Sequence, residues 1–373
     1  MGLVTPATER FGVVESVTTT TATIPTDAPE GDGTLTWDST TVVVVEVSSD
    51  GVVGTGWTYG SPACAAVVEQ VLAPLLIGRG PLDVTGCWSA MVAALRNIGR
   101  PGIGGMALSA VDCALWDLKS RLLDVPLHRL LGCVHDSVPV YGSGGFTTYD
   151  DDQLAEQLSG WVRTERIPRV KIKIGESWGR AEARDLRRVR QAREVVGPQT
   201  ELYVDANGGY QVGQAVRVAQ ALDELDVRWF EEPVSSDDPA GLAVVRRSTG
   251  ADVTAGEYGY DLAYFGRMVG CVDCLQVDVT RCGGITELVR VAALAAASGL
   301  QVSGHCAPHQ HVAALSAVPN LRHLEWFHDH VRIERMIFEG TLDPDHGCLR
   351  PREDRPGHGL NLRRDVLDGF RAA

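Results

Sequence analysis

Short runs of β-branched and aliphatic residues alternate with helical segments at a steady interval from about residue 138 onward. This alternation is typical of βα units around a parallel sheet. The helical segments include 211–225, whose apolar residues fall on one face, and 285–297. Eight such units predict an α/β fold, a TIM-type (β/α)7-8 barrel. The strand-like runs are 138–141, 170–174, 202–204, 227–230, 253–255, 274–277, 300–303 and 323–326.

The first 135 residues follow a different pattern. Two strand-like runs, 13–21 and 41–47, flank a polar segment at 25–38 that we expect to be a loop. Between residues 106 and 123, apolar side chains recur at the period of a buried amphipathic helix. We therefore expect an N-terminal α+β capping domain at 1–135, followed by the barrel at 136–350. The last segment, 351–373, is too short to fold alone and is expected to pack on the capping domain.

Composition and charge exclude several classes of protein. The 373 residues include 34 Lys and Arg against 48 Asp and Glu, and this net charge of −14 argues against partners such as nucleic acid or an acidic membrane. The 44% of hydrophobic residues and 22% of charged residues are typical of a globular protein. No apolar stretch approaches the roughly 18 residues of a membrane span, and the start lacks a secretory signal, so we expect a cytoplasmic protein. Nine scattered cysteines, an odd number, suit reduced thiols.

The candidate chemistry lies where the predicted strands end. In a barrel of this type, active-site residues come from the carboxyl ends of the strands. Seven consecutive strands carry an ionisable residue near that end, each about one βα unit from the next. In chain order these residues are Lys171 with Lys173, then Asp205, Glu231, Glu257, Asp278, His305 and Glu325.

Three of these residues, Asp205, Glu231 and Glu257, are carboxylates on adjacent strands. Carboxylates that converge in a partly buried site repel one another unless a cation lies among them. Ligation by oxygen alone, with positions left for water and substrate, favours Mg²⁺. The three carboxylates are therefore the predicted metal ligands.

The other ionisable residues are candidate bases and acids. Lys171 and Lys173 lie on the same face of one strand, where each ammonium group is expected to lower the pKa of the other. Asp278 and His305 come from neighbouring strands, so the carboxylate can orient the imidazole. Glu325 can donate a hydrogen bond to an oxyanion if its carboxyl group is protonated. Together with a metal ion, this set fits abstraction of a proton next to a carboxylate and stabilisation of the enediolate that results.

With these residues the sequence resembles the enolase superfamily, and within it the mandelate racemase subgroup. The segment 110–119, AVDCALWDLK, and residues 126–132 also resemble the family's helix ahead of the barrel. The resemblance implies that Lys173 is the lysine base with Lys171 as its companion, and that Asn207 is a substrate-contacting amide. It further implies Mg²⁺ as cofactor, the dyad and electrophile roles given above, and a homo-oligomer.

The resemblance also discriminates within the superfamily. Relatives that resemble muconate-lactonising enzymes or dipeptide epimerases place a second lysine at the sixth strand. Here the segment 271–282 contains no lysine. The chain therefore resembles the mandelate racemase subgroup more closely than those relatives.

Further substrate contacts are expected from two cap loops, which the resemblance places near 20–37 and 55–59. Trp57 and Tyr59 belong to the second of these loops, and Ser143, Arg281 and His309 are candidate contacts from the barrel. Each barrel candidate also has a purely structural explanation. Ser143 fits a Gly-Ser turn, Arg281 can form a structural salt bridge, and His309 can lie on a surface loop.

Three functions remain open, all on a small-molecule carboxylate. In the first, dehydration of a sugar acid such as an aldonate or aldarate, Lys173 or His305 removes the α-proton, His305 expels the β-hydroxyl as water, and a 2-keto-3-deoxy acid forms. The second is a racemase or epimerase of a 2-hydroxy acid, with the same two residues on opposite faces. The third is a barrel that binds metal and carboxylate without turnover. We favour dehydration, because it is frequent in the subgroup and because the predicted cap loops are polar.

Overall fold

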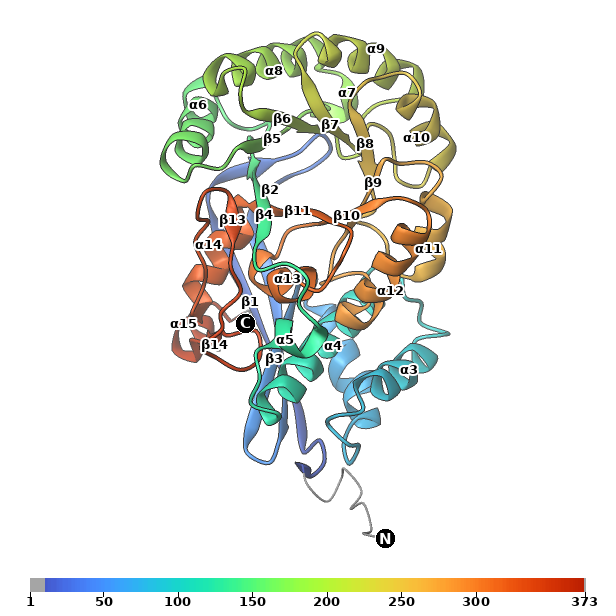
Figure 1. The fold of residues 1–373 in the computed structure, drawn as a ribbon, viewed down its shortest axis with the longest axis vertical. Coiled ribbons are helices and arrows are strands. Elements are labelled where there is room, and N and C mark those ends of the chain that lie inside the picture. Colours follow the sequence, from blue (N-terminus) through green and yellow to red (C-terminus); the bar gives the residue numbers. More distant parts are fainter. Residues whose placement is uncertain (1–10, 372–373) are drawn as a thin grey trace.

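Eight parallel strands close into a barrel in the part of the chain that the computed structural model describes, residues 11–371. Each barrel strand pairs with the next along the chain, and the last pairs back with the first. The α/β barrel is thus confirmed (Figure 1). Its strands are β4 (Val138–Gly144), β5 (Arg169–Lys173), β6 (Glu201–Asp205), β7 (Val227–Glu231), β8 (Asp252–Ala255), β9 (Cys274–Val277), β10 (Gln301–Gly304) and β11 (Leu321–Phe327).

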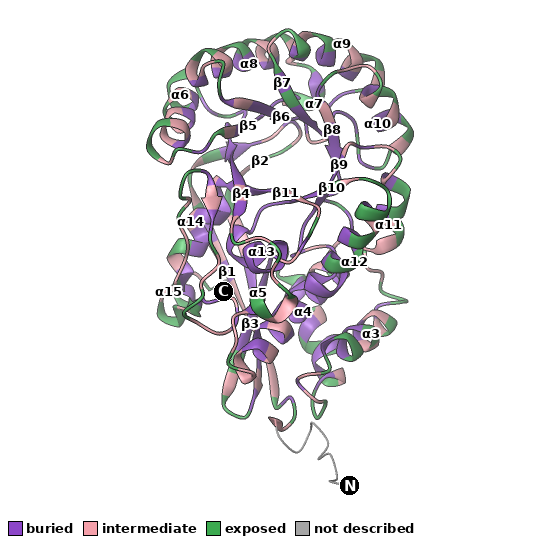
Figure 2. Cartoon of the chain, in the orientation of Figure 1, coloured by how far each residue is buried: buried purple, intermediate pink, exposed green. Residues whose placement is uncertain are grey.

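Helices cover the outer side of this ring. In α9 (Val212–Asp223) the buried side chains are Ala215, Val218, Ala219 and Leu222, so its apolar stripe packs against the barrel. Figure 2 shows the same division, with purple strands inside and green helix faces outside. The other barrel helices are α6 (Asp151–Ser159), η3 (Gly160–Thr164), α7 (Glu176–Gly179), α8 (Glu182–Val196), α10 (Pro239–Arg246), α11 (Leu262–Met268), α12 (Gly284–Ala297), α13 (Pro308–Leu315) and α14 (His328–Ile337).

The N-terminal part forms a three-stranded antiparallel sheet packed on helices. Its strands β1 (Ser16–Gly31) and β2 (Thr36–Ser49) form a long hairpin, so the expectation of a loop at 25–38 is wrong for most of that segment. The polar residues continue the strand pairing, with a register shift between Pro25 and Glu30. The remaining elements are β3 (Val52–Tyr59), α2 (Ala63–Val67), η1 (Val68–Leu72), η2 (Ala73–Leu75), α3 (Val84–Ala94), α4 (Ile103–Leu122) and α5 (Leu127–Leu131).

The valine run of β2 is buried on both faces of this sheet. Val43 and Val45 belong to a core shared with α4, whereas Val42 and Val44 belong to a second core shared with α14. Because side chains alternate across a strand, consecutive apolar residues require cover on both sides. The sheet therefore lies between its own helix and the barrel's last helix.

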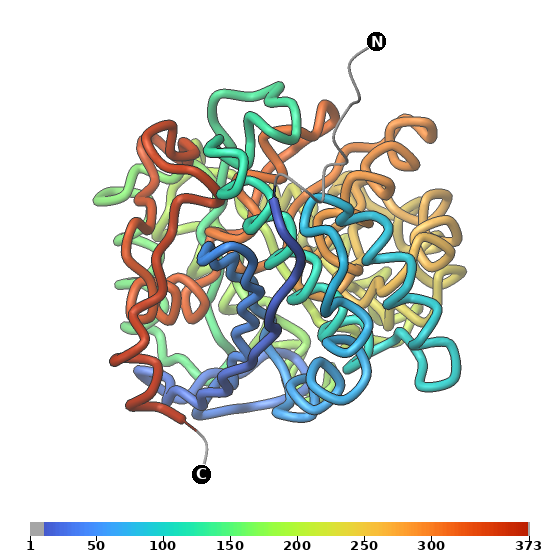
Figure 3. The backbone as a smooth tube through the Cα atoms, turned by 90° about the horizontal axis from the view of Figure 1, so that it is seen from below, coloured from blue at the N-terminus to red at the C-terminus, as the bar shows by residue number. Residues whose placement is uncertain are grey.

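The C-terminal segment runs back along the capping sheet (Figure 3). The Thr23 backbone N–H donates to the Phe370 carbonyl at 3.0 Å, and Leu360 and Leu367 join the core that contains Val42 and Val44. The division into domains at residue 135 stays a prediction. The elements of this segment are β12 (Phe338–Glu339), β13 (Cys348–Leu349), β14 (Asn361–Leu362) and α15 (Arg364–Asp368).

Two further features bear on the sequence analysis. Among residues 11–371, none of the helices combines the length and apolar character that crossing a membrane requires. All nine cysteines are free thiols.

One buried carboxyl group links the capping helix α4 to the barrel helix α12. Asp112 accepts hydrogen bonds from the Thr286 backbone N–H at 2.9 Å and from its hydroxyl at 2.6 Å. Burial raises the pKa of Asp112 to about 7, although these hydrogen bonds act to lower it. The folded protein therefore binds this proton more tightly than the unfolded chain, whose carboxyl pKa is about 3.9.

Substitution of Gly54 tests the contact between β3 and α4. A Cβ at Gly54 would lie 2.3 Å from the Ala114 carbonyl oxygen and the Leu118 nitrogen, which are backbone atoms of a packed helix. Gly54→Ala should therefore destabilise the protein by roughly 1–3 kcal/mol, seen as a lower urea midpoint. The control Gly213→Ala, in α9 with no atom within 4 Å, should not lower the midpoint. Equal midpoints for wild type and Gly54→Ala would contradict the contact.

The pH dependence of stability tests the buried Asp112. Because its pKa is raised in the folded state, its contribution favours folding at low pH and is lost as the pH rises from about 4 through about 7. Asp112→Asn removes the titration, so the melting temperature of this variant should fall less between pH 5 and pH 8 than that of wild type. The exposed Asp151→Asn provides the control for a surface charge. Parallel pH profiles for wild type and Asp112→Asn would show that the group does not titrate as stated.

Candidate active site

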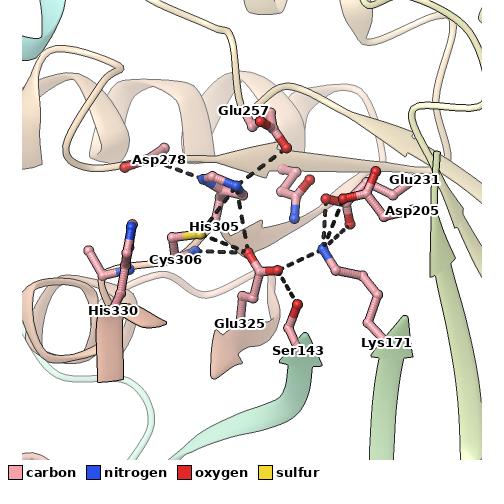
Figure 4. Close-up of polar contacts among 12 residues, drawn as sticks. Ser143, Lys171, Asp205, Glu231, Glu257, Asp278, His305, Cys306, Glu325 and His330 are labelled. Carbon is pink, nitrogen blue, oxygen red and sulfur yellow. Dashed lines mark hydrogen bonds and ion pairs between the residues drawn. The ribbon is translucent and has the colours of Figure 1, made fainter. Parts of the chain in front are cut away.

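Three carboxylates meet at the carboxyl ends of neighbouring barrel strands. Asp205 ends β6 and Glu231 ends β7, and the two residues lie opposite each other in the parallel register. Glu257 follows the end of β8. One carboxylate oxygen from each residue lies within 4.8 Å of the others (Figure 4). The structure therefore brings together the three predicted metal ligands.

This group of carboxylates fits a hard divalent cation. All three side chains are buried, and burial together with the Asp205 charge raises the pKa of Glu231 to about 8. Several carboxylates crowded in a buried site are costly without positive charge among them. Oxygen ligands alone suit Mg²⁺. Asp205, Glu231 and Glu257 are the residues that would hold it.

Two lysines from β5 lie against this group. Lys171 Nζ donates to both Glu231 oxygens at 2.7 Å and lies 2.7 Å from Glu325 Oε1. Lys173 Nζ, nearer the end of the strand, donates to Asp205 Oδ2 at 2.5 Å. Lys171 is fully buried, whereas Lys173 lines the cavity described below. Lys173 is therefore the lysine that can reach a substrate.

The pKa prediction for these lysines is wrong. Burial lowers the pKa of Lys173, and Lys171 lowers it further, but the charges of Asp205, Glu325 and Glu231 together outweigh both effects and the net pKa is raised. The pKa of Lys171 is also raised, because Glu231, Glu325 and Asp205 outweigh its burial. Lys171 does lower the pKa of Lys173, as expected from the sequence, but the surrounding carboxylates raise the pKa of both lysines by more.

A histidine and an aspartate form the opposite side of the site. His305 Nδ1 lies 2.8 Å from Asp278 Oδ2, and its Nε2 lies 3.3 Å from Glu257 Oε2 (Figure 4). Burial alone would raise the pKa of Asp278, but the His305 partner lowers it to about 2. Burial lowers the pKa of His305, yet its acidic neighbours raise the net value well above the usual range. The structure therefore favours an imidazolium held by a carboxylate.

Glu325 at the end of β11 is held as a carboxylate. It accepts hydrogen bonds from the Ser143 hydroxyl at 2.6 Å and the Cys306 backbone N–H at 3.0 Å, and it pairs with Lys171. Burial would raise its pKa, but Lys171 and His305 lower the net value well below the usual range. The protonated Glu325 considered from the sequence is therefore not the form that this arrangement stabilises.

A cavity of about 380 Å³ opens between the barrel and the capping hairpin. Lys173 at the end of β5 and His305 after β10 contribute to its wall, and the strands that carry the three carboxylates lie between them in the sheet order. Asn207 and Arg281 also line the cavity. Arg281 lies 3.2 Å from Glu257 and 3.4 Å from Asp278, so it pairs within the site. From the cap, the lining residues are Asp32, Trp37, Ser39, Thr40, Thr41 and Gly60.

The other proposed substrate contacts lie behind this wall. Trp57, Tyr59 and His309 converge on the buried carboxylate of Glu334, at 3.1, 3.2 and 2.6 Å. The segment 55–59 is part of β3, so the expected second cap loop is wrong and only Gly60 beyond it reaches the cavity. The substrate-binding roles of Trp57, Tyr59, His309 and Ser143 stay predictions.

Two residues of the barrel, Tyr258 and Cys306, line the cavity without a role in the sequence analysis. Tyr258 and Cys306 each directly follow a strand-end residue, and this adjacency was the signal that could have found them. Cys306 Sγ lies 3.3 Å from His305 Nε2. His330 lies three residues beyond the end of β11, and its ring lines the cavity, stacked on that of Tyr59 with 3.5 Å between ring centroids.

Comparison with known families identifies two matching models. Residues 15–132 match "Mandelate racemase / muconate lactonizing enzyme, N-terminal domain", and residues 153–366 match "Enolase C-terminal domain-like". Together they cover the capping sheet and the barrel strands β5 to β11.

Individual relatives cover nearly the whole chain. The D-galactarolactone cycloisomerase of Agrobacterium fabrum is 31% identical, over 92% of this chain and 95% of its own. A mandelate racemase/muconate lactonizing enzyme-like protein from Rubrobacter xylanophilus is 49% identical, with a TM-score of 0.94 over 96% of this chain and 100% of its own. L-talarate/galactarate dehydratase from Salmonella typhimurium is 26% identical, with a TM-score of 0.91 over 100% and 95% of the two chains. A mutant L-talarate/galactarate dehydratase has been solved with Mg and L-glucarate.

Removal of one carboxylate tests the metal site. Asp205→Asn should weaken Mg²⁺ binding roughly tenfold or more, because even partners outside the first coordination sphere contribute that much. Isothermal titration calorimetry measures the affinity. Glu201→Gln, at the other end of β6, is the matched control and should bind Mg²⁺ as wild type does. Equal affinities for Asp205→Asn and Glu201→Gln would exclude Asp205 as a ligand.

Proposed function

This chain belongs to the mandelate racemase/muconate lactonizing enzyme family of the enolase superfamily, and from that membership we propose that it dehydrates a sugar acid, an aldonate or aldarate, to a 2-keto-3-deoxy acid. One observation carries the proposal. Lys173 and His305 line one cavity, and the strands that carry the carboxylates Asp205, Glu231 and Glu257 lie between them in the sheet order. A sugar acid whose carboxylate lies near these three residues has its α-carbon between a base and an acid.

Each residue has a distinct part in the proposed reaction. Lys173, as the neutral amine, takes the α-proton, and the C–H electrons form the enediolate. The β-carbon to oxygen bond then breaks, and the His305 imidazolium gives its proton to the departing hydroxyl, which leaves as water. The remaining enol takes a proton from solvent at C3 and becomes the 2-keto-3-deoxy acid. Asp278 keeps His305 oriented and charged for this step.

The carboxylate group would hold the cofactor. When bound, Mg²⁺ supplies positive charge that stabilises the negative charge developing on the substrate carboxylate as the α-proton is removed. The same positive charge favours the neutral form of Lys173. Arg281 balances Glu257 and Asp278, so these two acids do not repel the substrate carboxylate with their full charge. A dehydratase relative with Mg and L-glucarate supports this choice of cofactor and substrate class. We further propose that the protein forms a homo-oligomer and acts in the cytoplasm.

Two other reactions would use the same proton abstraction. Cycloisomerisation is supported by the relative that carries that name. Racemisation or epimerisation is supported by the placement of Lys173 and His305 on either side, in the sheet order, of the strands that carry the carboxylates. The three reactions differ only in the fate of the enediolate.

Proton NMR in D₂O with Mg²⁺ and a panel of C4 to C6 aldonic and aldaric acids, together with their lactones, tests the proposal. A new signal from a 3-deoxy carbon should appear with one or a few of these acids. Deuterium at the α-carbon with an unchanged skeleton would instead support the racemase, and turnover of lactones alone would support the cycloisomerase. Mandelate, which lacks a β-hydroxyl, controls for proton exchange without elimination.

Two substitutions separate the base from the acid. Lys173→Ala and His305→Asn should each reduce the dehydration rate by roughly 10²-fold or more, the usual contribution of a positioned acid or base. His346→Asn, an exposed histidine, is the control. If each variant keeps α-deuterium exchange on one enantiomer of a 2-hydroxy acid, the two-base racemase is supported. Wild-type dehydration rates in Lys173→Ala would contradict the proposed role of that residue.

A further inference from the structure

A second cavity of about 720 Å³ adjoins the cavity that contains Lys173 and His305. The two cavities share Asn207 and Tyr258 as lining residues. Sites that hold a whole small ligand have volumes of roughly 300–1,000 Å³. The second cavity, called the outer cavity below, is thus large enough for a group beyond a six-carbon acid.

The wall of the outer cavity is aromatic. Trp178, Tyr258, Tyr260 and Tyr264 all line it. Trp178 is 61% exposed, and its backbone N–H donates to the Gly33 carbonyl at 2.9 Å, which ties it to the tip of the capping hairpin. Large aromatic rings left on the surface provide flat apolar faces. A sugar ring, whose C–H bonds form an apolar face, packs on such surfaces.

Buried polar atoms point to a hydroxylated ligand. Within residues 11–371, Asn207 Oδ1 and Glu232 Oε1 are buried without a hydrogen-bond partner, and both residues line the outer cavity. Ser236 lies beside the Tyr264 hydroxyl and lines the same wall. Buried polar groups without partners are uncommon, because each costs free energy. Ligand hydroxyls can serve as both donors and acceptors for this set.

The charged residues that line the outer cavity favour an uncharged part of a ligand there. Glu232, Asp237 and Asp261 line the outer cavity with a single cation, Arg267. A second carboxylate at this position would therefore meet a net acidic wall. An aldaric acid, which is charged at both ends, fits this arrangement less well than a neutral polyhydroxylated group.

We propose that the outer cavity binds a neutral glycosyl ring attached at O4 of an aldonic acid, beyond the two carbons C2 and C3 that react. The inference rests on the proposed function, because the acid portion occupies the inner cavity. Proton removal at C2 and loss of the C3 hydroxyl leave a glycosyl group at O4 untouched. The products would be water and a glycosylated 2-keto-3-deoxy acid.

Binding and turnover of matched acids test this inference. Gluconic acid is compared with its O4-glycosylated forms, cellobionic, maltobionic and lactobionic acid, by calorimetry with Mg²⁺ and by NMR in the same samples. At least one glycosylated acid should bind tenfold more tightly than gluconic acid. Trp178→Ala should remove most of that gain and leave gluconic acid binding unchanged. Tyr264→Phe, which removes only the hydroxyl, should reduce the gain less.

The outcomes separate this inference from the proposed function. A binding gain that Trp178→Ala abolishes, without any 3-deoxy product, upholds the ring site and contradicts the dehydratase. Dehydration of simple acids, with no glycosylated acid bound more tightly, upholds the dehydratase and overturns the ring site. A change of oligomeric state in Trp178→Ala with no difference in affinity also overturns it, because the wall then belongs to a subunit contact.

Discussion

The balance of charge at the carboxyl ends of the barrel strands is the constraint on which the site depends. Asp205, Glu231, Glu257, Asp278 and Glu325 converge there in a buried space. Each lies against a cationic partner, from Lys171 on one side to His305 on the other. Buried carboxylates persist only with such compensation. The same compensation fixes the positions of the groups that move protons.

The capping hairpin forms the part of the cavity wall that the barrel does not supply. The Thr147 backbone N–H donates to the Gly31 carbonyl at 2.8 Å, and the Thr40 hydroxyl donates to Asp329 at 2.5 Å. These bonds hold β1 and β2 across the barrel mouth, where Figure 1 shows the hairpin reaching from the cap to the strands. The cavity therefore exists only in the assembled chain, and its specificity depends on the fit of the two parts.

The sequence alone predicted the features that a short stretch of residues specifies. The spacing of acidic residues at strand ends, one βα unit apart, predicted the barrel and the positions of Asp205 and Glu231. Both the period and the residue types can be read directly from the sequence. The hairpin at 25–38 was missed because its polar residues and prolines resemble a loop, and only pairing with β2 makes it a strand. The raised lysine pKa was missed for a related reason. It depends on the charges of Glu231, Glu325 and Asp205, which lie on three other strands, and the spacing of residues within one strand does not contain that information.

The return of the C-terminal segment to β1 has a consequence for synthesis of the protein. The face of the capping sheet that includes Val42 and Trp57 is covered by Ile333, Phe338 and Leu367. A growing chain thus carries this apolar face uncovered until residues 333–367 have left the ribosome. Domains that are synthesised first generally fold first, but the capping sheet cannot be fully covered before the barrel has been synthesised. Loss of residues 333–367 would therefore leave this face of the capping sheet exposed, and a nascent chain that has not yet made them presents an apolar surface that chaperones can bind.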